Sequence, residues 1–224
     1  MSITVRDDVS TEVIQTWGSD ELIARAARVS NNNDKLEGVD PKRLVNALWR
    51  EGHTTPFEIC GATILVEVPI FVARQLVKHR HLSISEVSGR YGVLETNFYM
   101  PAHDRPLLNV GSSMNPDMKM GSDQLHAIAL NAHIRAYEVA EDSYRSMIAS
   151  GVANEVARSV LPVGVYTRIY VSANLHAFLK LLDLRGRLAS GHPQYEIEKM
   201  ADGIEEILAD AFPHALQAWR DNRR

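Results

Sequence analysis

The chain has 224 residues, of which 45% are hydrophobic and 23% are charged. This is the composition of a globular domain, and it excludes disordered, collagen-like and low-complexity chains. Its 28 acidic and 24 basic residues give a formal net charge of −4, which argues against a nonspecific nucleic-acid coat because such a coat needs a basic surplus.

The N-terminal part of the chain predicts two helices. Ser19 opens the first helix, which has one apolar face, and the asparagine-rich stretch 31–34 follows it as a loop. Asp40 and Pro41 begin the second helix, with aspartate as the N-cap and proline at the first helical position. Gly52 ends this helix.

The next segments predict a strand between helical stretches. Residues 54–58 form a turn or a short helical cap. Residues 62–68 alternate with a period of two, which predicts a strand that ends at Pro69. Residues 70–79 have helical spacing, whereas 81–90 is polar and serine-rich, so we expect a loop there.

The second half of the chain is mostly helical. Residues 106–122 contain prolines, glycines and methionines without a period, which predicts a surface excursion. Residues 123–150 predict one long helix that ends at Gly151. The remaining segments are, in order, a short helix over 154–161, a strand over 165–171, a helix from Asn174 to about Leu184, a basic glycine-containing loop over 186–193 and a last long helix over 193–211.

Few strands among many helices predict an α+β fold. We expect a compact single domain over residues 1–224, with a small mixed or antiparallel sheet and several long helices. The length suits one domain, and the chain shows neither an internal repeat nor a linker.

Several kinds of site and location are excluded by the sequence. The single cysteine, Cys60, allows neither an intramolecular disulfide nor a cysteine-based zinc site. His79 and His81 are two residues apart and do not face one another on a helix, so we expect no metal site. No stretch approaches the ~20 apolar residues of a membrane helix, and the N-terminus lacks a signal-peptide core. We expect a cytoplasmic protein that contacts no membrane.

The densest polar stretch lies at residues 74–90. It holds four cations, two histidines, three serines and one carboxylate. Hydroxyls, backbone N–H groups and guanidinium forks are the groups that recognise phosphate. The alternative is a solvated helix end followed by a surface loop, and composition alone does not decide between the two.

The order of residues in this stretch resembles the signature of the flavin-dependent thymidylate synthases. That signature is Arg-His-Arg, seven residues and Ser, and here Lys78, His79 and Arg80 precede Ser88 by that spacing, with lysine at the first position. Further segments resemble the family in the same order, namely 24–30, 52–58, 69–75, 88–91, 156–162, 166–168 and 194–197.

The resemblance implies a specific activity. Such enzymes are homotetramers that convert dUMP to dTMP with methylenetetrahydrofolate as the carbon donor. Their reductant is reduced FAD, which NADPH recharges, and each active site is assembled from several subunits. The expected partners are therefore a pyrimidine nucleotide (dUMP, or UMP in related enzymes), folate and NADPH, with no nucleic acid.

The resemblance also implies a nucleotide site. Ser88 and the backbone near Gly89 are expected to hold the phosphate, and Glu86 to accept from a ribose hydroxyl. Arg185 is expected to be catalytic, because a permanent cation favours the ionised uracil N3. The complete expected set is Gln75, Leu76, Val77, Lys78, Glu86, Val87, Ser88, Gly89, Arg90, Arg158 and Arg185.

The flavin site follows from the same resemblance. Lys78 departs from the usual arginine and loses the planar fork of guanidinium, and His176 stands where the family often has arginine. The complete expected set is Ser30, His53, Thr55, Lys78, His79, Arg80, Glu86, Asn174 and His176. The cofactor would supply the hydride, while the protein supplies position and field.

One departure leaves the substrate open. The connection 186–193 is longer than is usual in the family, so Arg187 could take the role expected of Arg185. The alternatives are a pyrimidine-nucleotide methylase or hydroxymethylase that acts on UMP or dUMP, and a non-catalytic flavin- or nucleotide-binding protein. A third is an RNA-binding module that uses residues 74–90.

Other residues have structural interpretations. The cysteine-dependent thymidylate synthases attack uracil with a thiol, whereas Cys60 lies beside an apolar strand and is expected to be a small buried hydrophobe. The long helix 123–150 is expected to be scaffold and subunit interface. Four residues near the C-terminus are expected to be solvated surface, namely His214, Arg220, Arg223 and Arg224.

Overall fold

The computed structural model describes residues 3–32, 35, 38–189 and 191–223. The predicted loops 31–34 and 186–193 therefore lie partly outside the described residues, and Arg224, which was predicted to be surface, lies wholly outside them. The chain groups into two units. Unit 1 consists of Met1–Val9, Glu67–Leu76 and Glu86–Ile169, and unit 2 of Ser10–Val66, Val77–Ser85 and Tyr170–Arg224.

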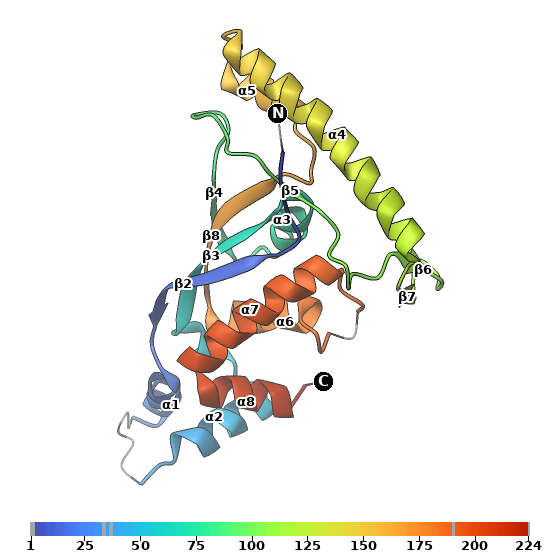
Figure 1. Cartoon of the computed structure of the whole chain (residues 1–224). Helices are drawn as coiled ribbons and strands as arrows, with labels where there is room; N and C mark the ends of the chain where they lie inside the picture. The colour runs from blue at the N-terminus through green and yellow to red at the C-terminus, as the bar shows by residue number, and fades with distance from the viewer. Residues whose placement is uncertain (1–2, 33–34, 36–37, 190, 224) are drawn as a thin grey trace. The chain divides into compact units, whose positions relative to one another are not determined.

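The main sheet has four strands in the order β2–β3–β8–β4 (Figure 1). The two inner strands, β3 (Gly61–Pro69) and β8 (Tyr166–Asn174), confirm the strands predicted from alternation. The outer strands are β2 (Ser10–Trp17), which was not predicted, and β4 (Ser83–Glu86). The prediction of a loop throughout 81–90 was therefore wrong. Most residues of both outer strands are exposed, so pairing with a neighbour, rather than a local apolar pattern, makes them strands.

Unit 1 combines short strands with one long helix. Val5 lies opposite Phe98 in a parallel pair of strands, and Phe98 stacks on Tyr137 with 4.7 Å between ring centroids. Met100 and Val165 complete this buried cluster. The elements are β1 (Thr4–Arg6), α3 (Ile70–Leu76), β5 (Asn97–Tyr99), β6 (Leu108–Asn109), β7 (Met118–Lys119), α4 (Asp123–Ala149), α5 (Asn154–Ala157) and the 3-10 helix η3 (Arg158–Val160).

Two helix predictions are resolved in unit 1. The predicted helix 70–79 was three residues too long, because α3 ends at Leu76 and a turn follows. The long helix α4 is confirmed, and the Ser122 hydroxyl accepts from the backbone N–H of Leu125 at 3.2 Å. Gly151 follows with φ of 82°, a value that favours glycine. Along α4 only three described residues are buried, namely Tyr137, Glu141 and Tyr144.

Unit 2 is built from capped helices. Ser19, Asp40 and Asn174 each accept a backbone N–H with the side chain, at 3.3, 3.0 and 2.8 Å, and so confirm the three predicted helix starts. The helix α7 packs against β2, α6 and α8 (Figure 1). The elements are α1 (Asp20–Arg28), η1 (Val29–Asn31), α2 (Pro41–Arg50), η2 (Thr55–Glu58), α6 (Leu175–Arg185), α7 (Tyr195–Ala211) and α8 (Pro213–Asp221).

The C-terminal segment corrects a prediction. Of the four C-terminal residues expected to be solvated surface, Arg224 lies outside the described residues, and the Arg223 side chain is only 16% exposed, which contradicts the prediction. Residues 213–221 form α8, whose Leu216 and Trp219 are buried. The Trp219 indole N–H donates to Asp183 at 2.8 Å, and the guanidinium of Arg223 lies 4.3 Å from the centre of the Trp219 ring. Arg220, which is exposed, agrees with the prediction. The physical reason for the error is that α8 presents the ring of Trp219 to the Arg223 guanidinium, which packs on it instead of extending into solvent.

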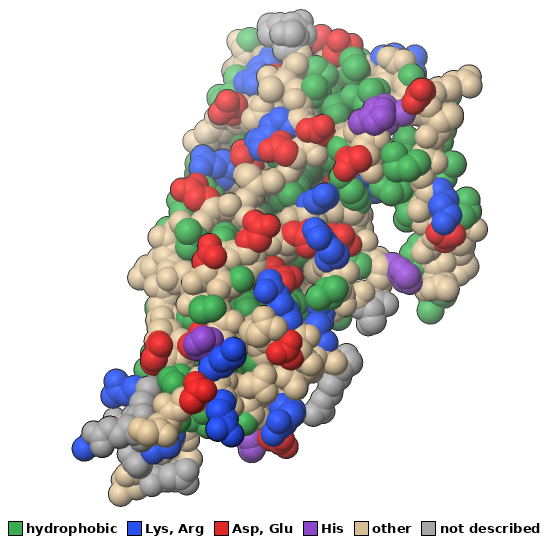
Figure 2. Space-filling view, turned by 60° about the horizontal axis from the view of Figure 1, so that its bottom comes forward, with side chains coloured by type: hydrophobic (Ala, Val, Ile, Leu, Met, Phe, Trp, Pro, Cys, Tyr) green, Lys and Arg blue, Asp and Glu red, His purple; other side chains and the backbone are tan. Residues whose placement is uncertain are grey.

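The surface and the helices give three further observations. Lys and Arg side chains are interspersed with Asp and Glu side chains on the face that Figure 2 shows. Among the described residues, no helix is both long and apolar enough to cross a bilayer. Within the same residues, no three side chains of the metal-binding types lie together.

Candidate functional site

Unit 1 contains a pocket of about 370 Å³, which we call the Ser88 pocket. It lies where β4 ends, where β8 begins and where η3 passes nearby. Five of the residues expected to bind nucleotide line it, namely Glu86, Val87, Ser88, Gly89 and Arg158. The other lining residues are Ile70, Leu94, Leu161, Val165, Tyr166 and Thr167.

A tight turn forms one wall of the Ser88 pocket. The backbone N–H of Val87 donates to the carbonyl of Arg168 at 3.0 Å, which continues the pairing of β4 with β8 by one residue. The Ser88 hydroxyl then accepts from the backbone N–H of Arg90 at 3.3 Å. A Cβ on Gly89 would lie 2.6 Å from Leu94 Cδ1. Only glycine therefore fits this turn without moving the pocket wall.

Two arginines near this pocket differ in whether they have an ion-pair partner. Arg90 Nε lies 2.9 Å from Glu155 Oε2, so its charge is partly balanced within the chain. Arg158 is exposed, and its guanidinium makes neither a hydrogen bond nor an ion pair with the described residues. An unpaired guanidinium beside a serine hydroxyl and a glycine turn suits a phosphate group.

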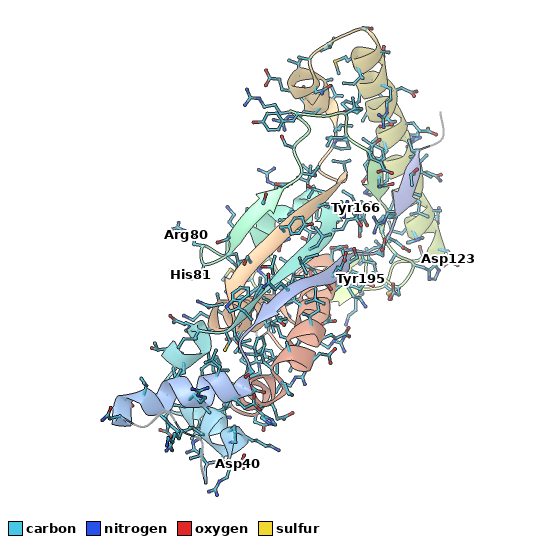
Figure 3. The ribbon with its side chains drawn as sticks, turned by 90° about the vertical axis from the view of Figure 1, so that its left-hand side faces the viewer. Asp40, Arg80, His81, Asp123, Tyr166 and Tyr195 are labelled. Carbon is cyan, nitrogen blue, oxygen red and sulfur yellow. The ribbon has the colours of Figure 1, made fainter. Side chains whose placement is uncertain are left out.

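The start of β8 supplies two polar side chains to the same pocket. The Thr167 hydroxyl donates to Glu86 Oε1 at 2.6 Å. The phenol of Tyr166, labelled in Figure 3, donates to the carbonyl of Asp8, and burial raises its pKa. The guanidinium of Arg6 lies 4.6 Å from the centre of the Tyr166 ring, so this phenol is held in place by structural contacts.

Unit 2 contains a second pocket of about 540 Å³, which we call the His53 pocket. Three residues expected at the flavin line it, namely Ser30, His53 and Thr55. Its remaining walls come mainly from α1 and α2 and are largely apolar, namely Ala26, Ala27, Arg28, Val39, Leu44, Leu48, Pro56 and Ile59. Apolar walls with a few polar groups are typical of sites for small molecules and cofactors.

Arg28 makes the His53 pocket suited to a ligand with acceptor groups. Its Nε is buried and has no hydrogen-bond partner among the described residues. A buried donor without a partner is costly, so an acceptor on a bound molecule would stabilise it. His53 follows Gly52, whose φ of 77° ends α2, and the His53 backbone N–H donates to the Leu48 carbonyl at 2.8 Å.

Arg185 lies at the end of α6, against His79. Arg185 Nε donates to His79 Nε2 at 3.3 Å. Burial, and then the positive charge of Arg185, lower the pKa of His79, so its imidazole is neutral and able to accept this bond. Arg187 instead forms an exposed ion pair with Asp202, with 2.6 Å between Nη2 and Oδ2. The sequence left open whether Arg185 or Arg187 acts on the uracil. Of the two, Arg185 is the one that forms a hydrogen bond with another expected site residue.

Other expected flavin residues also have contacts within the chain. The Asn174 side chain caps α6, and His176 Nδ1 lies 3.1 Å from Glu58 Oε1. Lys78 and Arg80 are exposed in the connection between α3 and β4. In Figure 3 the Arg80 side chain projects away from the ribbon.

Six expected nucleotide residues lie outside the lining of the Ser88 pocket, and one of them, Arg90, follows directly after Gly89 in the turn. Gln75 and Leu76 belong to α3 in unit 1, and the Leu76 side chain is fully buried. Val77 and Lys78 are exposed residues of unit 2. The remaining expected residue of unit 2 is Arg185.

Cys60 is buried, as the sequence predicted. Its thiol donates to the Ser19 carbonyl at 3.5 Å, and burial raises its pKa. A protonated thiol that lines neither pocket is unsuited to attack a substrate.

Sequence reasoning missed Thr167 and Arg28 as pocket residues. Both lie in segments that resemble the family, 166–168 and 24–30, so their segments were identified but their roles were not. No local signal pairs Thr167 with Glu86, because the two residues are far apart in the chain.

Comparison with known proteins gives consistent matches. A model of the family described as "Thymidylate synthase complementing protein" matches residues 12–214. The chain is 36% identical over 219 residues to a flavin-dependent thymidylate synthase of Thermotoga neapolitana, a match that covers 98% of this chain and 94% of that protein. It is also 36% identical over 234 residues to a flavin-dependent thymidylate synthase of Streptomyces coelicolor, covering 99% of this chain and 95% of that protein.

A solved structure is also similar. It is the UMP/dUMP methylase PolB from Streptomyces cacaoi bound with 5-Br UMP, with a TM-score of 0.91 and 34% sequence identity. The match covers 98% of this chain and 97% of that chain. The same methylase bound with 5-Br dUMP matches with a TM-score of 0.90.

Proposed function

This chain belongs to the thymidylate synthase complementing protein family, and on that premise we propose that it is a flavin-dependent thymidylate synthase. It reductively methylates dUMP to dTMP, with FAD as cofactor and with methylenetetrahydrofolate and NADPH as co-substrates. The observation that carries the proposal is the Ser88 pocket, where five residues expected at the nucleotide meet.

In this proposal the Ser88 pocket binds the nucleotide. A nucleotide phosphate is repelled by a protein of net charge −4, so binding needs a local cation. Arg158 provides an unpaired guanidinium, while the Ser88 hydroxyl and the turn at Gly89 provide hydrogen-bonding groups close to it. Glu86 accepts from a sugar hydroxyl.

Arg185 is proposed to stabilise the activated uracil. A guanidinium stays positive at any working pH, so it favours negative charge on the ring. A neutral His79 holds its Nε and leaves the terminal Nη groups available for the base. The buried, protonated Cys60 does not supply a nucleophile in this scheme.

The His53 pocket is proposed to hold part of the flavin. Its apolar wall suits a ring system, and Arg28 and Thr55 offer donors to polar groups of the cofactor. The Ser30 hydroxyl donates to the Ala27 carbonyl at 2.9 Å, so it can only accept from the cofactor. Lys78 and Arg80 are proposed to meet its diphosphate. FAD supplies the hydride when it is bound.

A methylase that accepts UMP is the second candidate. The specific observation is the likeness to PolB, which is named as a UMP/dUMP methylase and is about as similar in sequence as the thymidylate synthases. The comparisons are therefore compatible with either dUMP or UMP as the substrate of this chain.

We also propose that the chain forms a homotetramer. In α4, Ile128 and Val139 are 58% and 69% exposed, and in the outer strand β2, Val13 and Ile14 are 49% and 44% exposed. Apolar side chains along an exposed helix and an exposed strand are typical of surfaces that a second copy covers. The expected native mass is four times the chain mass of 25.0 kDa.

The test is anaerobic turnover with FAD, NADPH and methylenetetrahydrofolate, with dUMP and UMP supplied together and products identified by mass spectrometry. We expect dTMP as the main product. Methylated UMP would instead support the second candidate, and no product from a flavin-loaded protein would contradict both.

The same assay tests which of two arginines, Arg185 or Arg187, stabilises the uracil. Arg185→Ala is expected to lower turnover by about 10²-fold or more, the usual cost of removing one charge-stabilising donor. Arg187→Ala, which breaks the exposed pair with Asp202, is expected to retain turnover. The opposite result would move the uracil role to Arg187.

A further inference from the structure

A buried threonine holds the one carboxylate that lines the Ser88 pocket. Thr167 is the second residue of β8, and only 4% of its surface is exposed. Glu86 is the last residue of the neighbouring strand β4 and is exposed. The Thr167 hydroxyl donates to Glu86 Oε1 at 2.6 Å, and both side chains line the pocket.

This bond fixes the position of a side chain that would otherwise move. Threonine is β-branched and stiff about χ1, and its burial leaves the hydroxyl little freedom. A short hydrogen bond to an ionised carboxylate is among the stronger kinds. An exposed glutamate without such a bond would sample several rotamers.

The same bond determines which oxygen of Glu86 remains available to a ligand. Glu86 Oε1 is occupied by Thr167, whereas Oε2 makes no hydrogen bond within the described part of the chain. An ionised carboxylate oxygen can only accept, so its partner on a ligand must be a donor. In a nucleotide, the sugar hydroxyls are such donors, and ribose has one more of them than deoxyribose.

We propose that Thr167 is a positioning residue that holds Glu86 toward the sugar of the bound nucleotide and thereby sets the preference between deoxyribose and ribose. This inference rests on the proposed function of the Ser88 pocket. A carboxylate oxygen at a fixed place distinguishes the two sugars, because it either meets a hydroxyl or faces the place where one is missing. A mobile carboxylate adapts to both sugars and distinguishes them poorly.

The chain offers a matched control for this threonine. Thr96 is also buried in unit 1, and its hydroxyl donates to the carboxylate of Glu141 at 2.7 Å. Thr96 and Glu141 do not line the Ser88 pocket. The Thr96 hydroxyl also accepts from Arg145 Nη2 at 2.9 Å. Thr96→Val therefore removes the same kind of bond and one more from the same unit, without touching the proposed sugar contact, and is the more severe of the two changes.

The experiment measures the Kd of dUMP and of UMP for the FAD-loaded protein by titration calorimetry. Thr167→Val removes the hydroxyl at nearly constant shape. We expect it to weaken binding of the preferred nucleotide about tenfold, and to bring the ratio of the two Kd values toward one, because a hydrogen bond to a charged group is one of the stronger kinds and only part of its strength is transmitted to the ligand. Thr167→Ser should restore both quantities, and Thr96→Val should change neither.

A double-mutant cycle tests whether Thr167 acts through Glu86. In a Glu86→Gln background, Thr167→Val should have no further effect on the ratio of Kd values. A full additional effect would overturn the proposal. If Thr167→Val does not fold, Thr167→Ala removes the same hydroxyl without a new methyl position and gives the same comparison.

Failure of the Thr167 role and failure of the proposed function give different results. If the wild-type protein binds both nucleotides and Thr167→Val keeps the wild-type ratio, the positioning role is refuted while the proposed function stands. If the wild-type protein binds neither nucleotide, the proposed function fails, and the inference that rests on it fails too.

Discussion

The start of α8 is held by a residue far away in the chain. Asp20, in the first turn of α1, is only 4% exposed. Its Oδ2 accepts from the backbone N–H of His214 at 2.8 Å and its Oδ1 from that of Ala215 at 2.9 Å. No side chain within α8 provides a cap. Asp20→Ala is therefore expected to destabilise α8 and the helices packed against it.

The magnitude follows from the groups that lose their partner. Each buried N–H left without an acceptor costs about 1–3 kcal/mol, and loss of an N-cap costs about 0.5–2 kcal/mol. Burial raises the pKa of Asp20 although both backbone donors lower it, so the ionised carboxylate carries a desolvation cost that offsets part of its bonds. We therefore expect Asp20→Ala to lower the free energy of unfolding by about 2 kcal/mol, near the lower end of the combined range.

The assay is urea denaturation followed by circular dichroism, at one protein concentration because the chain is proposed to oligomerise. Glu21→Ala is the matched control, since Glu21 is the next residue and is exposed. It should change the free energy of unfolding by less than about 0.5 kcal/mol. If the two variants were equally stable, the reasoning that Asp20 caps α8 would be refuted.

Two further predictions concern the candidate site. Burial and Arg185 lower the pKa of His79, so below about pH 6.5 the unfolded chain takes up a proton that the folded chain resists. The free energy of unfolding should fall as the pH drops through that range, and should fall less steeply in His79→Gln; an unchanged slope in urea titrations would contradict this. Gly89→Ala should weaken dUMP binding about tenfold, because overpacking costs about 1–3 kcal/mol. The control in the same calorimetric titration is Gly92→Ala, because a Cβ there meets nothing within 4 Å. If both variants bound dUMP equally well, the reasoning that a Cβ at Gly89 disturbs the pocket would be refuted.

Much of the helical framework could be predicted from the sequence. The starts at Ser19, Asp40 and Asn174 are local, because a polar side chain bonds an N–H two or three residues away. The inner strand β3 was also predictable, since alternation over adjacent residues reflects the sheet environment directly. The order of residues from Lys78 to Ser88 similarly indicated which segment of the chain carries the candidate site.

The outer strands and α8 depend on distant partners. β2 and β4 become strands by pairing at the sides of a sheet whose inner strands come from other parts of the chain. The cap of α8 comes from Asp20, 194 residues before His214. No window of neighbouring residues contains such information, because the stabilising groups meet only after folding.

The candidate site also divides into features that local sequence determines and features that only the fold determines. The sequence by itself determined the residue types and their order, with Ser88 and Gly89 in one short segment that resembles a known signature. Only the tertiary structure placed Thr167 beside Glu86, 81 residues away, and Arg185 beside His79, 106 residues away. Local sequence specifies which chemical groups are present, whereas strand pairing and helix packing decide which of them come within hydrogen-bond distance, and those bonds set the orientation of the side chains.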